Sequence, residues 1–336
     1  MSSATRPAVT DLADLGGMAG RIAHLGRPAR LLSLGAGVQS TTLALAAVDG
    51  LIPPVDVAVF ADTGWEPAAV YAHLARLGDA LAEADVPLLI VSHGNIRDDA
   101  LSPGHRFASM PLHTQEDPTP ESDGKGMVRR QCTSEYKLRP IKEAARALLG
   151  AEVGGKGDGR VKVGRVKRGR WLYNVVGIST DEVLRVKPSD VGYLRRTDPL
   201  IDVLGWSRSQ CIAWLAERWD APVARSACLG CPFHSNAEWR AIRDDDPRGW
   251  ADVVEFDAAI RGGNRRLNMP HLRGKAYLHP DRVPLSEADI DRVTAHERRK
   301  TAPSLFDGLD PFGCSPYGCH RSDEGAIFDP DDREAS

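Results

Sequence analysis

Short apolar runs alternate with segments of helical spacing from residue 30 to residue 219. The apolar runs occupy residues 30–34, 55–64, 86–94 and 171–180. Segments rich in helix-forming residues lie at residues 40–49, 66–84, 133–150 and 207–219. Strands that are apolar throughout and are separated by helices are typical of a parallel sheet covered on both faces. The pattern therefore predicts an α/β fold with a doubly wound, Rossmann-like parallel sheet.

The remaining segments have weaker patterns. Residues 95–130 contain proline, glycine and charged residues of both signs, and we expect them to form a mobile loop over the ligand site described below. Residues 236–261 have the spacing of one or two helices. The predicted division is an N-terminal extension (1–28), the sheet domain, interpreted below as nucleotide-binding (29–220), a helical C-terminal region with a cysteine cluster (221–320) and an acidic tail expected to be disordered (321–336).

Composition limits the class of protein. The chain has 336 residues, of which 42% are hydrophobic and 26% charged, as in soluble globular proteins. A formal net charge of −3 excludes a global basic field, so nucleic acid would need a local patch. No apolar run reaches the length of a membrane span or a signal peptide. We therefore expect a cytoplasmic protein without membrane contact, whose six cysteines stay reduced and serve as ligands or reactive thiols.

The first apolar run leads into a loop of small residues, Gly35-Ala36-Gly37-Val38-Gln39, and then into a helical pattern from Ser40. Backbone N–H groups at such a turn, together with the N-terminus of the helix, form an anion site. The loop lacks the lysine of a Walker motif and the glycine spacing of a dinucleotide fingerprint. The alternative to phosphate binding is a tight strand-to-helix turn without a ligand.

The loop resembles the PP-loop of ATP pyrophosphatases, Ser-Gly-Gly-x-Asp-Ser, which aligns with Gly35–Ser40. Gly37 and Ser40 match it, whereas Gly35, Ala36 and Gln39 replace a serine, a glycine and an aspartate. Three further segments resemble the phosphoadenylyl-sulfate (PAPS) reductase-like branch of that superfamily: "FADTGWEP" (60–67), "GISTDEVLR" (177–185) and "DPLIDVLGWSRSQCIAWL" (198–215). The resemblance implies an adenine nucleotide alpha-hydrolase-like fold.

The resemblance also implies residue roles and the cofactors ATP and Mg²⁺. The nucleotide-binding residues that it implies are Ser33, Gly35, Ala36, Gly37, Gln39, Ser40, Thr41, Phe60, Asp62, Thr63, Gly177 and Ser179. Ser40 would donate a hydroxyl to phosphate, and Asp62 would hold Mg²⁺ or orient substrate. Asp181, with Glu182, is a further catalytic candidate. Each aspartate has the alternative role of capping a helix or stabilising a turn.

Cysteines suggest a metal centre. Cys228 and Cys231 form a Cys-x-x-Cys turn, which brings two sulfurs within reach of one metal or cluster, although a redox dithiol or an incidental pair has the same spacing. Cys132 lies where the similar iron–sulfur adenylyl-sulfate reductases have a cysteine pair, with Gln131 in place of its partner. That resemblance implies a [4Fe–4S] cluster on Cys132, Cys228 and Cys231, with Cys314 or Cys319 as fourth ligand. Zinc or no metal are the alternatives.

Two other side chains near the cysteines receive simpler interpretations. Cys211 lies inside a helical pattern and is expected to be a core residue, since unpaired cysteine is commonly buried. His234 is interpreted as a loop residue in preference to a ligand.

Three functions fit these features. The first is an ATP-dependent, AMP- and pyrophosphate-forming sulfurtransferase, similar to the sulfur-transfer component of DNA phosphorothioation, with Cys319 available for sulfur chemistry. Its substrate would be a nucleotide or a nucleic acid held by the basic loop 156–170, and its sulfur donor a protein such as a cysteine desulfurase. The second is an adenylyl-sulfate or PAPS reductase that attacks with Cys319. The third is a non-catalytic nucleotide-binding module. A homo-oligomer and a purely structural cluster also remain open.

Overall fold

A parallel sheet forms the centre of the molecule. The computed structural model describes residues 6–102, 110–157, 160–221, 223, 225–262 and 274–294. The central strands are β1 (Arg30–Leu34), β2 (Val57–Asp62), β3 (Leu88–Ser92), β8 (Leu172–Val176) and β9 (Leu194–Thr197). They pair in the order β3-β2-β1-β8-β9, and every pairing is parallel. The order reverses between β1 and β8, which is where open α/β sheets bind ligands. The predicted fold class is confirmed.

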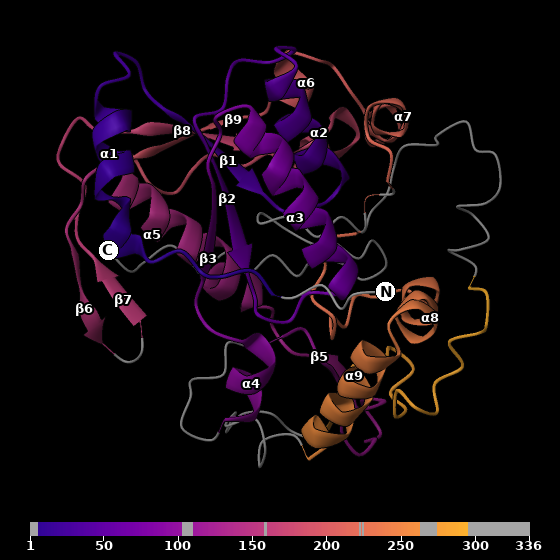
Figure 1. Cartoon of the computed structure of the whole chain (residues 1–336). Coiled ribbons are helices and arrows are strands. Elements are labelled where there is room, and N and C mark those ends of the chain that lie inside the picture. Colours follow the sequence, from indigo (N-terminus) through magenta and orange to yellow (C-terminus); the bar gives the residue numbers. More distant parts are fainter. Residues whose placement is uncertain are drawn as a thin grey trace.

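Helices cover both faces of this sheet (Figure 1). One face packs against α2 (Val38–Val48), α3 (Ala68–Glu83), α6 (Pro199–Asp202) and α7 (Arg208–Arg218). The other packs against η1 (Leu12–Leu15), α1 (Gly16–Ala23) and α5 (Arg139–Leu148). Neighbours along a strand alternate between the faces, since Leu31 joins the second core and Leu32 the first. Cys211 of α7 is fully buried in the first core, as predicted.

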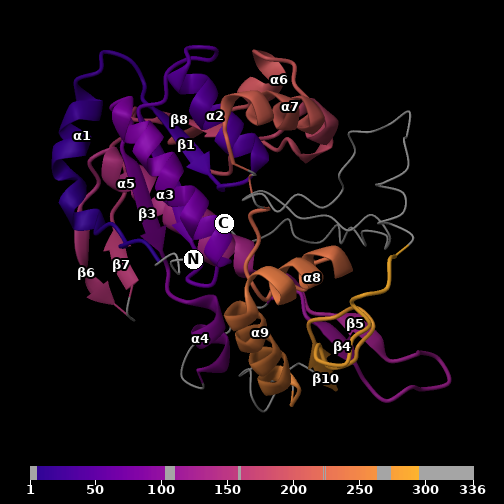
Figure 2. The same ribbon diagram turned by 45° about the vertical axis from the view of Figure 1, so that its right-hand side comes forward.

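A separate core lies beside the sheet, below it in Figure 2. Its helices are α4 (Ile96–Leu101), α8 (Asn236–Asp245) and α9 (Pro247–Ile260). Its antiparallel sheet has the order β10-β4-β5, with β4 (His113–Gln115), β5 (Lys125–Met127) and β10 (Lys275–Tyr277). The prediction of a loop over 95–130 is therefore wrong where α4, β4 and β5 form. The C-terminal region adds β10 to its helices.

Residues 153–157 and 160–163 form two paired strands, which reach into the predicted basic loop 156–170. Strands β6 (Val153–Gly157) and β7 (Arg160–Val163) pair antiparallel as a separate two-stranded sheet. The connection from β7 to β8 keeps most of the predicted cations. A short 3₁₀ segment, η3 (Thr180–Arg185), follows β8.

The N-terminal segment packs against the sheet. The Thr10 N–H donates to the carbonyl of Ile90 at 2.7 Å, and Leu12, Leu15 and Ile22 are buried in the core beneath α5. The predicted tail 321–336 lies outside the described residues. Within the described ranges, no helix combines the length and the apolar character needed to cross a bilayer.

Candidate functional site

The loop after β1 turns sharply into α2. Helix α2 begins at Val38, two residues before the predicted start, so Gln39 belongs to its first turn. Ala36 has a φ of +56°, a left-handed conformation that glycine adopts readily and alanine rarely. Gly177 follows β8 and lies so close that a Cβ there would be 3.0 Å from the Ser40 nitrogen. The end of β8 therefore closes one side of the loop, as expected at a switch point between neighbouring strands.

Ser40 shapes the loop from within. Its Oγ accepts hydrogen bonds from the N–H groups of Gly35 at 3.2 Å and Gly37 at 3.3 Å. Among the described residues, no acceptor takes the N–H of Val38 or Gln39, which belong to the first turn of α2. The anion-binding groups that remain are thus at the start of the helix, and the Ser40 hydroxyl is engaged within the loop.

Gln39 connects the loop to η3 and α7. Its Nε2 donates to Glu182 Oε2 at 3.0 Å and its Oε1 accepts from Arg208 Nη1 at 3.1 Å. Burial raises the pKa of Glu182, although the guanidinium of Arg185, which pairs with it, opposes this. A carboxylate at position 39 would face that of Glu182, so a neutral amide suits the position where the PP-loop pattern has aspartate. Ser179, fully buried, lies 3.5 Å from Gln39 Nε2.

The two candidate aspartates take part in structural bonds. Asp62 is fully buried and accepts from Arg6 Nε at 2.5 Å, the Tyr71 hydroxyl at 2.9 Å and the Gly64 N–H at 2.9 Å. Burial and the charge of Asp62 raise the pKa of Tyr71. These bonds favour the turn-stabilising alternative for Asp62.

Asp181 contacts the start of α7 through one carboxylate oxygen. Its Oδ1 accepts the N–H of Arg208, the first residue of that helix, at 3.0 Å. Its buried Oδ2 has no hydrogen-bond partner among the described residues. Asp181 Oδ1 therefore has the alternative role of contacting a helix. Asp181 Oδ2 remains a candidate for catalysis.

Three of the residues assigned to the nucleotide have side chains that contact other parts of the protein. The Ser33 hydroxyl donates to Asn174 Oδ1 at 2.7 Å inside the sheet. Thr41 Oγ1 lies 2.9 Å from His73 Nε2 between α2 and α3. Phe60 is buried in the core beneath these helices. Ser33 and Phe60 lie on strands, where alternation turns their side chains inward, and Thr41 lies on the face of α2 that contacts α3. Motif position alone does not encode these directions.

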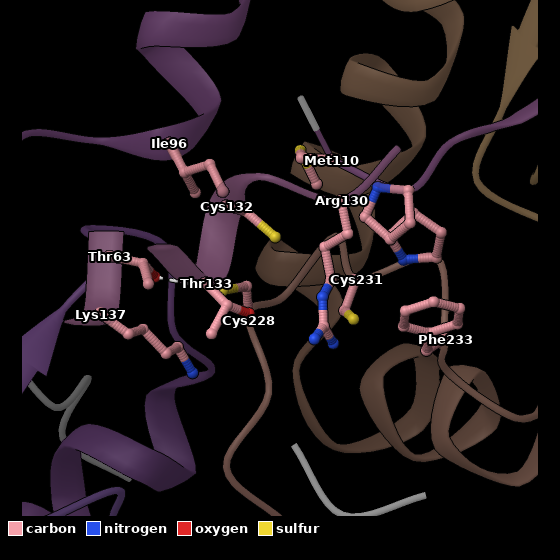
Figure 3. Close-up of a pocket in the computed structure, with 12 residues that line it drawn as sticks. Thr63, Ile96, Met110, Arg130, Cys132, Thr133, Lys137, Cys228, Cys231 and Phe233 are labelled. Atoms are coloured by element: carbon pink, nitrogen blue, oxygen red, sulfur yellow. Dashed lines mark hydrogen bonds between the residues drawn. The ribbon is translucent and has the colours of Figure 1, made fainter. Parts of the chain in front are cut away.

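The cysteines predicted as ligands line one pocket (Figure 3). Cys132 lies just before the π-helical segment η2 (Ser134–Leu138), and Cys228 and Cys231 lie on the turn before α8. The pocket also contains Thr63, Ile96, Met110, Pro111, Arg130, Thr133, Lys137, Pro232 and Phe233. Three thiols from segments almost 100 residues apart thus share one cavity. Cys314 and Cys319, including the catalytic assignment of Cys319, lie outside the described residues.

The Cys-x-x-Cys turn is held by its own backbone and by His234. The Cys231 N–H donates to the carbonyl of Cys228 at 3.0 Å, and His234 Nε2 lies 2.9 Å from the same oxygen. This agrees with the interpretation of His234 as a loop residue. Gly230 packs against the ring of Trp65, where a Cβ would be 2.1 Å from Cη2. The Leu229 N–H donates to the Trp65 carbonyl at 2.7 Å. The "DTGW" segment therefore supports the turn.

Polar groups at the exit of β2 surround the Cys228 thiol. Its Sγ–H donates to Thr63 Oγ1 at 3.3 Å, and the Thr63 hydroxyl donates to Glu66 Oε1 at 2.9 Å. Lys137 Nζ lies 4.0 Å from the same Glu66 oxygen. Burial raises the pKa of Cys228, the charge of Glu66 adds to this, and Lys137 opposes it. A group of positive charge bound by this thiol would favour its ionised form.

The donor set is of the kind that binds soft metals or an iron–sulfur cluster. Sulfur ligands select soft metals and iron–sulfur clusters. Within the ranges that the structure describes, no three histidine, cysteine, aspartate or glutamate side chains are arranged to hold one metal ion. A [4Fe–4S] cluster binds each thiolate through a different iron, so its ligands stand farther apart around a shared cavity. Cys132, Cys228 and Cys231 are the thiols of this pocket that would hold such a cluster.

A single segment joins the loop and the thiol pocket. A Cβ on Gly37 would lie 3.5 Å from Ser226 Cβ, and one on Gly35 would lie 3.9 Å from Ser226 Oγ. Cys228 follows two residues later. The predicted nucleotide site and the predicted cluster site are therefore neighbours.

Several residues of the site were not predicted: Glu66, Lys137, Arg208, Ser226 and Gly230. Lys137 follows Cys132 by five residues, a spacing that an ordinary α-helix places on different faces. The π-helical segment, closed by the Arg139 N–H on the Ser134 carbonyl, widens the turn there and allows both to line the pocket. No signal in the sequence marks that widening.

The chain was compared with known protein families, protein sequences and solved structures. No protein-family model matches the chain, and no curated protein sequence matches it. Among solved structures, the chain is similar in part to the crystal structure of phosphoadenylyl-sulfate (PAPS) reductase from Candida auris in its phosphate complex. The identity is 14%, the TM-score is 0.36, and the match covers 65% of this chain and 91% of that chain.

Proposed function

We propose that this chain is an ATP-dependent sulfurtransferase of the PP-loop type. It binds ATP and Mg²⁺, adenylates a nucleotide or nucleic-acid substrate with release of pyrophosphate, and supports sulfur transfer with a [4Fe–4S] cluster. The observation that carries the proposal is the contact of Ser226 with the loop at Gly37, two residues before Cys228. The phosphate-binding loop and the thiols would then act on the same bound substrate.

The start of α2 is the group we assign to the phosphates. The N–H groups of Val38 and Gln39, together with the positive end of the helix dipole, favour an anion. Arg208, held beside the loop by Gln39, adds positive charge. Because Gln39 replaces an aspartate, we assign the neighbouring Glu182 to Mg²⁺.

Adenylation prepares the substrate for sulfur. An acceptor oxygen attacks the α-phosphorus of ATP, pyrophosphate leaves, and the oxygen then departs with AMP when a sulfur nucleophile displaces it. The protein contributes positioning of the reactants and stabilisation of the developing phosphate charge.

The cluster would be held by Cys132, Cys228, Cys231 and one of the cysteines outside the described residues, Cys314 or Cys319. When bound to four thiolates, it would supply a rigid link between the two cores. The cysteine that is not a ligand, Cys314 or Cys319, would remain free for sulfur chemistry. Lys137 and Arg130 line the same pocket and offset the negative charge of thiolates.

The test measures products and cluster content on the full chain, purified without oxygen. We expect AMP and pyrophosphate from ATP in the presence of the acceptor, screened among RNA, DNA and small acids, together with bound iron and acid-labile sulfide. Gly177→Ala forces the loop away from the end of β8. We expect it to weaken ATP binding by about tenfold or more, which corresponds to about 1.4 kcal/mol.

Matched variants separate the two parts of the site. Gly155→Ala, where a Cβ meets no atom within 4 Å, is the control and keeps ATP affinity. Cys228→Ala loses iron and keeps ATP binding, whereas Cys211→Ala in the core retains iron. Sulfite release from adenylyl sulfate with a thiol reductant and without ATP would establish the reductase alternative. ATP binding without any product would establish the non-catalytic alternative.

A further inference from the structure

A basic groove lies at the edge of the sheet opposite the loop. It has a volume of about 530 Å³, and the residues that line it include Arg146, Arg165, Lys167, Arg168, Arg170, Trp171, Tyr193 and Arg195. Trp171 directly precedes β8, and Tyr193 directly precedes β9. These are the amino ends of parallel strands, whereas the loop at Gly35–Gly37 follows a carboxyl end. The groove is therefore separate from the proposed reaction site.

Within the part of the chain that the structure describes, no carboxylate neutralises the charge of this groove. No carboxylate of the described residues forms an ion pair with Arg165, Lys167, Arg168, Arg170 or Arg195. Of the acids nearby, Asp190 pairs with Lys142 at 2.5 Å, and Glu143 bonds to His93 at 2.6 Å and lies 3.8 Å from Arg146. Five cations gathered without counter-charge repel one another. An anionic ligand would relieve that repulsion.

Aromatic rings lie among these cations. The guanidinium of Arg195 stacks 3.7 Å from the ring centre of Trp171, and the Trp171 ring meets Tyr173 edge to face at 4.9 Å. Arg195 is exposed and Trp171 half-buried. A guanidinium that is fixed on an aromatic ring presents a flat, charged surface on which bases stack. The aromatic partners are thus supplied by the starts of β8 and β9, outside the basic stretch of the sequence.

We propose that this groove is a docking site for a nucleic acid, bound through its phosphodiester backbone. Arginine predominates over lysine among its cations, which suits phosphate, because the planar guanidinium donates two parallel hydrogen bonds to phosphate oxygens. A concave groove accommodates a nucleic-acid strand or duplex better than it accommodates a flat bilayer. The stacked rings favour nucleic-acid bases over acidic side chains as ligands. The site stands independently of the proposed adenylation, because it needs neither the loop nor the thiols.

The placement defines what the site does for the molecule. The groove adjoins the hairpin β6–β7, which lies on the side away from α8 and α9 in both views (Figure 1, Figure 2). A bound polynucleotide therefore occupies a face distant from the thiol pocket. It supplies affinity and orientation, and only a polymer long enough to extend round the sheet edge would also reach the loop.

The test compares two double charge reversals on the full chain. Arg165→Glu/Arg168→Glu changes the groove. Arg21→Glu/Arg248→Glu changes the net charge equally at exposed positions on α1 and α9. Binding of fluorescein-labelled 30-nucleotide RNA, single-stranded DNA and duplex DNA is measured by anisotropy between 50 and 250 mM salt, without ATP. Circular dichroism and thermal unfolding establish that each variant is folded, and Arg165→Ala/Arg168→Ala replaces any reversal that is not.

We expect the groove variant to lose about tenfold or more in affinity, and the slope of log K against log salt to fall by about two, because each lost phosphate contact removes about 0.7 to 0.9 from it. The control keeps the wild-type slope. The RNA and DNA arms identify which polymer binds. Equal effects of both double variants, or binding to phosphatidylserine vesicles or polyglutamate without binding to any polynucleotide, would overturn the proposal. Gly177→Ala should leave the binding unchanged, so a failure of the proposed adenylation is distinguishable.

Discussion

Gly230 shows how one residue without a side chain fixes the thiol pocket. A Cβ at this position would lie 2.1 Å from Trp65 Cη2 and 2.3 Å from Cζ3, so either the indole or the turn must move. The ring is itself fixed, since Trp65 Nε1 donates to Asp252 at 2.6 Å and the ring packs on Phe256. We expect Gly230→Ala to lower the free energy of unfolding by about 1–3 kcal/mol, measured in urea, and to lower bound iron.

The same chemical change elsewhere should act in the opposite direction. Gly20 lies inside α1, and a Cβ there meets nothing within 4 Å. Gly20→Ala is expected to stabilise the protein by about 0.5–1 kcal/mol, because alanine has the higher helix propensity. If Gly230→Ala were as stable as wild type and kept its iron, the contact with Trp65 would not control the turn.

At the scale of elements, the N-terminus of α8 connects the cysteine turn to its helix. Ser235 Oγ accepts the Glu238 N–H, and Glu238 Oε2 accepts the Ser235 N–H at 2.7 Å, a reciprocal capping box. We expect Ser235→Ala to cost about 1 kcal/mol in unfolding free energy and to speed the loss of iron to a chelator. Ser207→Ala removes the matching cap of α7 at a similar cost and should leave iron loss unchanged. Equal chelation rates in the two variants would contradict a link from this cap to the pocket.

Elements with a long pattern were predictable and short ones were not. Strands β1, β2, β3 and β8 and helices α3, α5 and α7 follow their predicted segments closely. Strands β4, β5 and β10 have three residues each, too few for periodicity, and β10 pairs with a strand about 160 residues earlier. Strand β9 reads "LRRT" and lacks the apolar run of an inner strand, because it lies at the sheet edge.

The cysteines of the candidate site were predictable from the sequence, whereas the residues that contact them were not. The Cys-x-x-Cys spacing named Cys228 and Cys231, and the resemblance to adenylyl-sulfate reductases named Cys132. The fold places all three in one pocket. The contacts that hold them, from Trp65, Glu66 and Lys137, depend on how two cores pack together. Such contacts carry no local signal in a sequence.

At the scale of the whole molecule, the thiol pocket lies between two cores whose contacts include buried carboxylates. Burial raises the pKa of Glu238, but His234 and Arg225 outweigh it and hold the pKa well below its usual range. Burial also raises the pKa of Glu143 in the sheet core, but His93, Arg139 and Arg146 outweigh this and lower it. A carboxylate whose folded pKa is depressed stabilises the fold fully above its unfolded pKa of about 4.3 and less as the pH falls through the folded value.

The protein should therefore lose stability from about pH 5 downward, by up to about 1.4 kcal/mol per pH unit for each such carboxylate. Glu238→Gln removes one of them, and we expect a lower stability at pH 7 together with a shallower fall between pH 5 and pH 3. Glu83→Gln, at an exposed position on α3, is the matched control and should follow the wild-type curve. Urea unfolding at each pH, followed by circular dichroism, measures both quantities. If the unfolding free energy of Glu238→Gln fell in parallel with that of wild type over this pH range, the contacts of Glu238 would not be a cause of the loss of stability in acid.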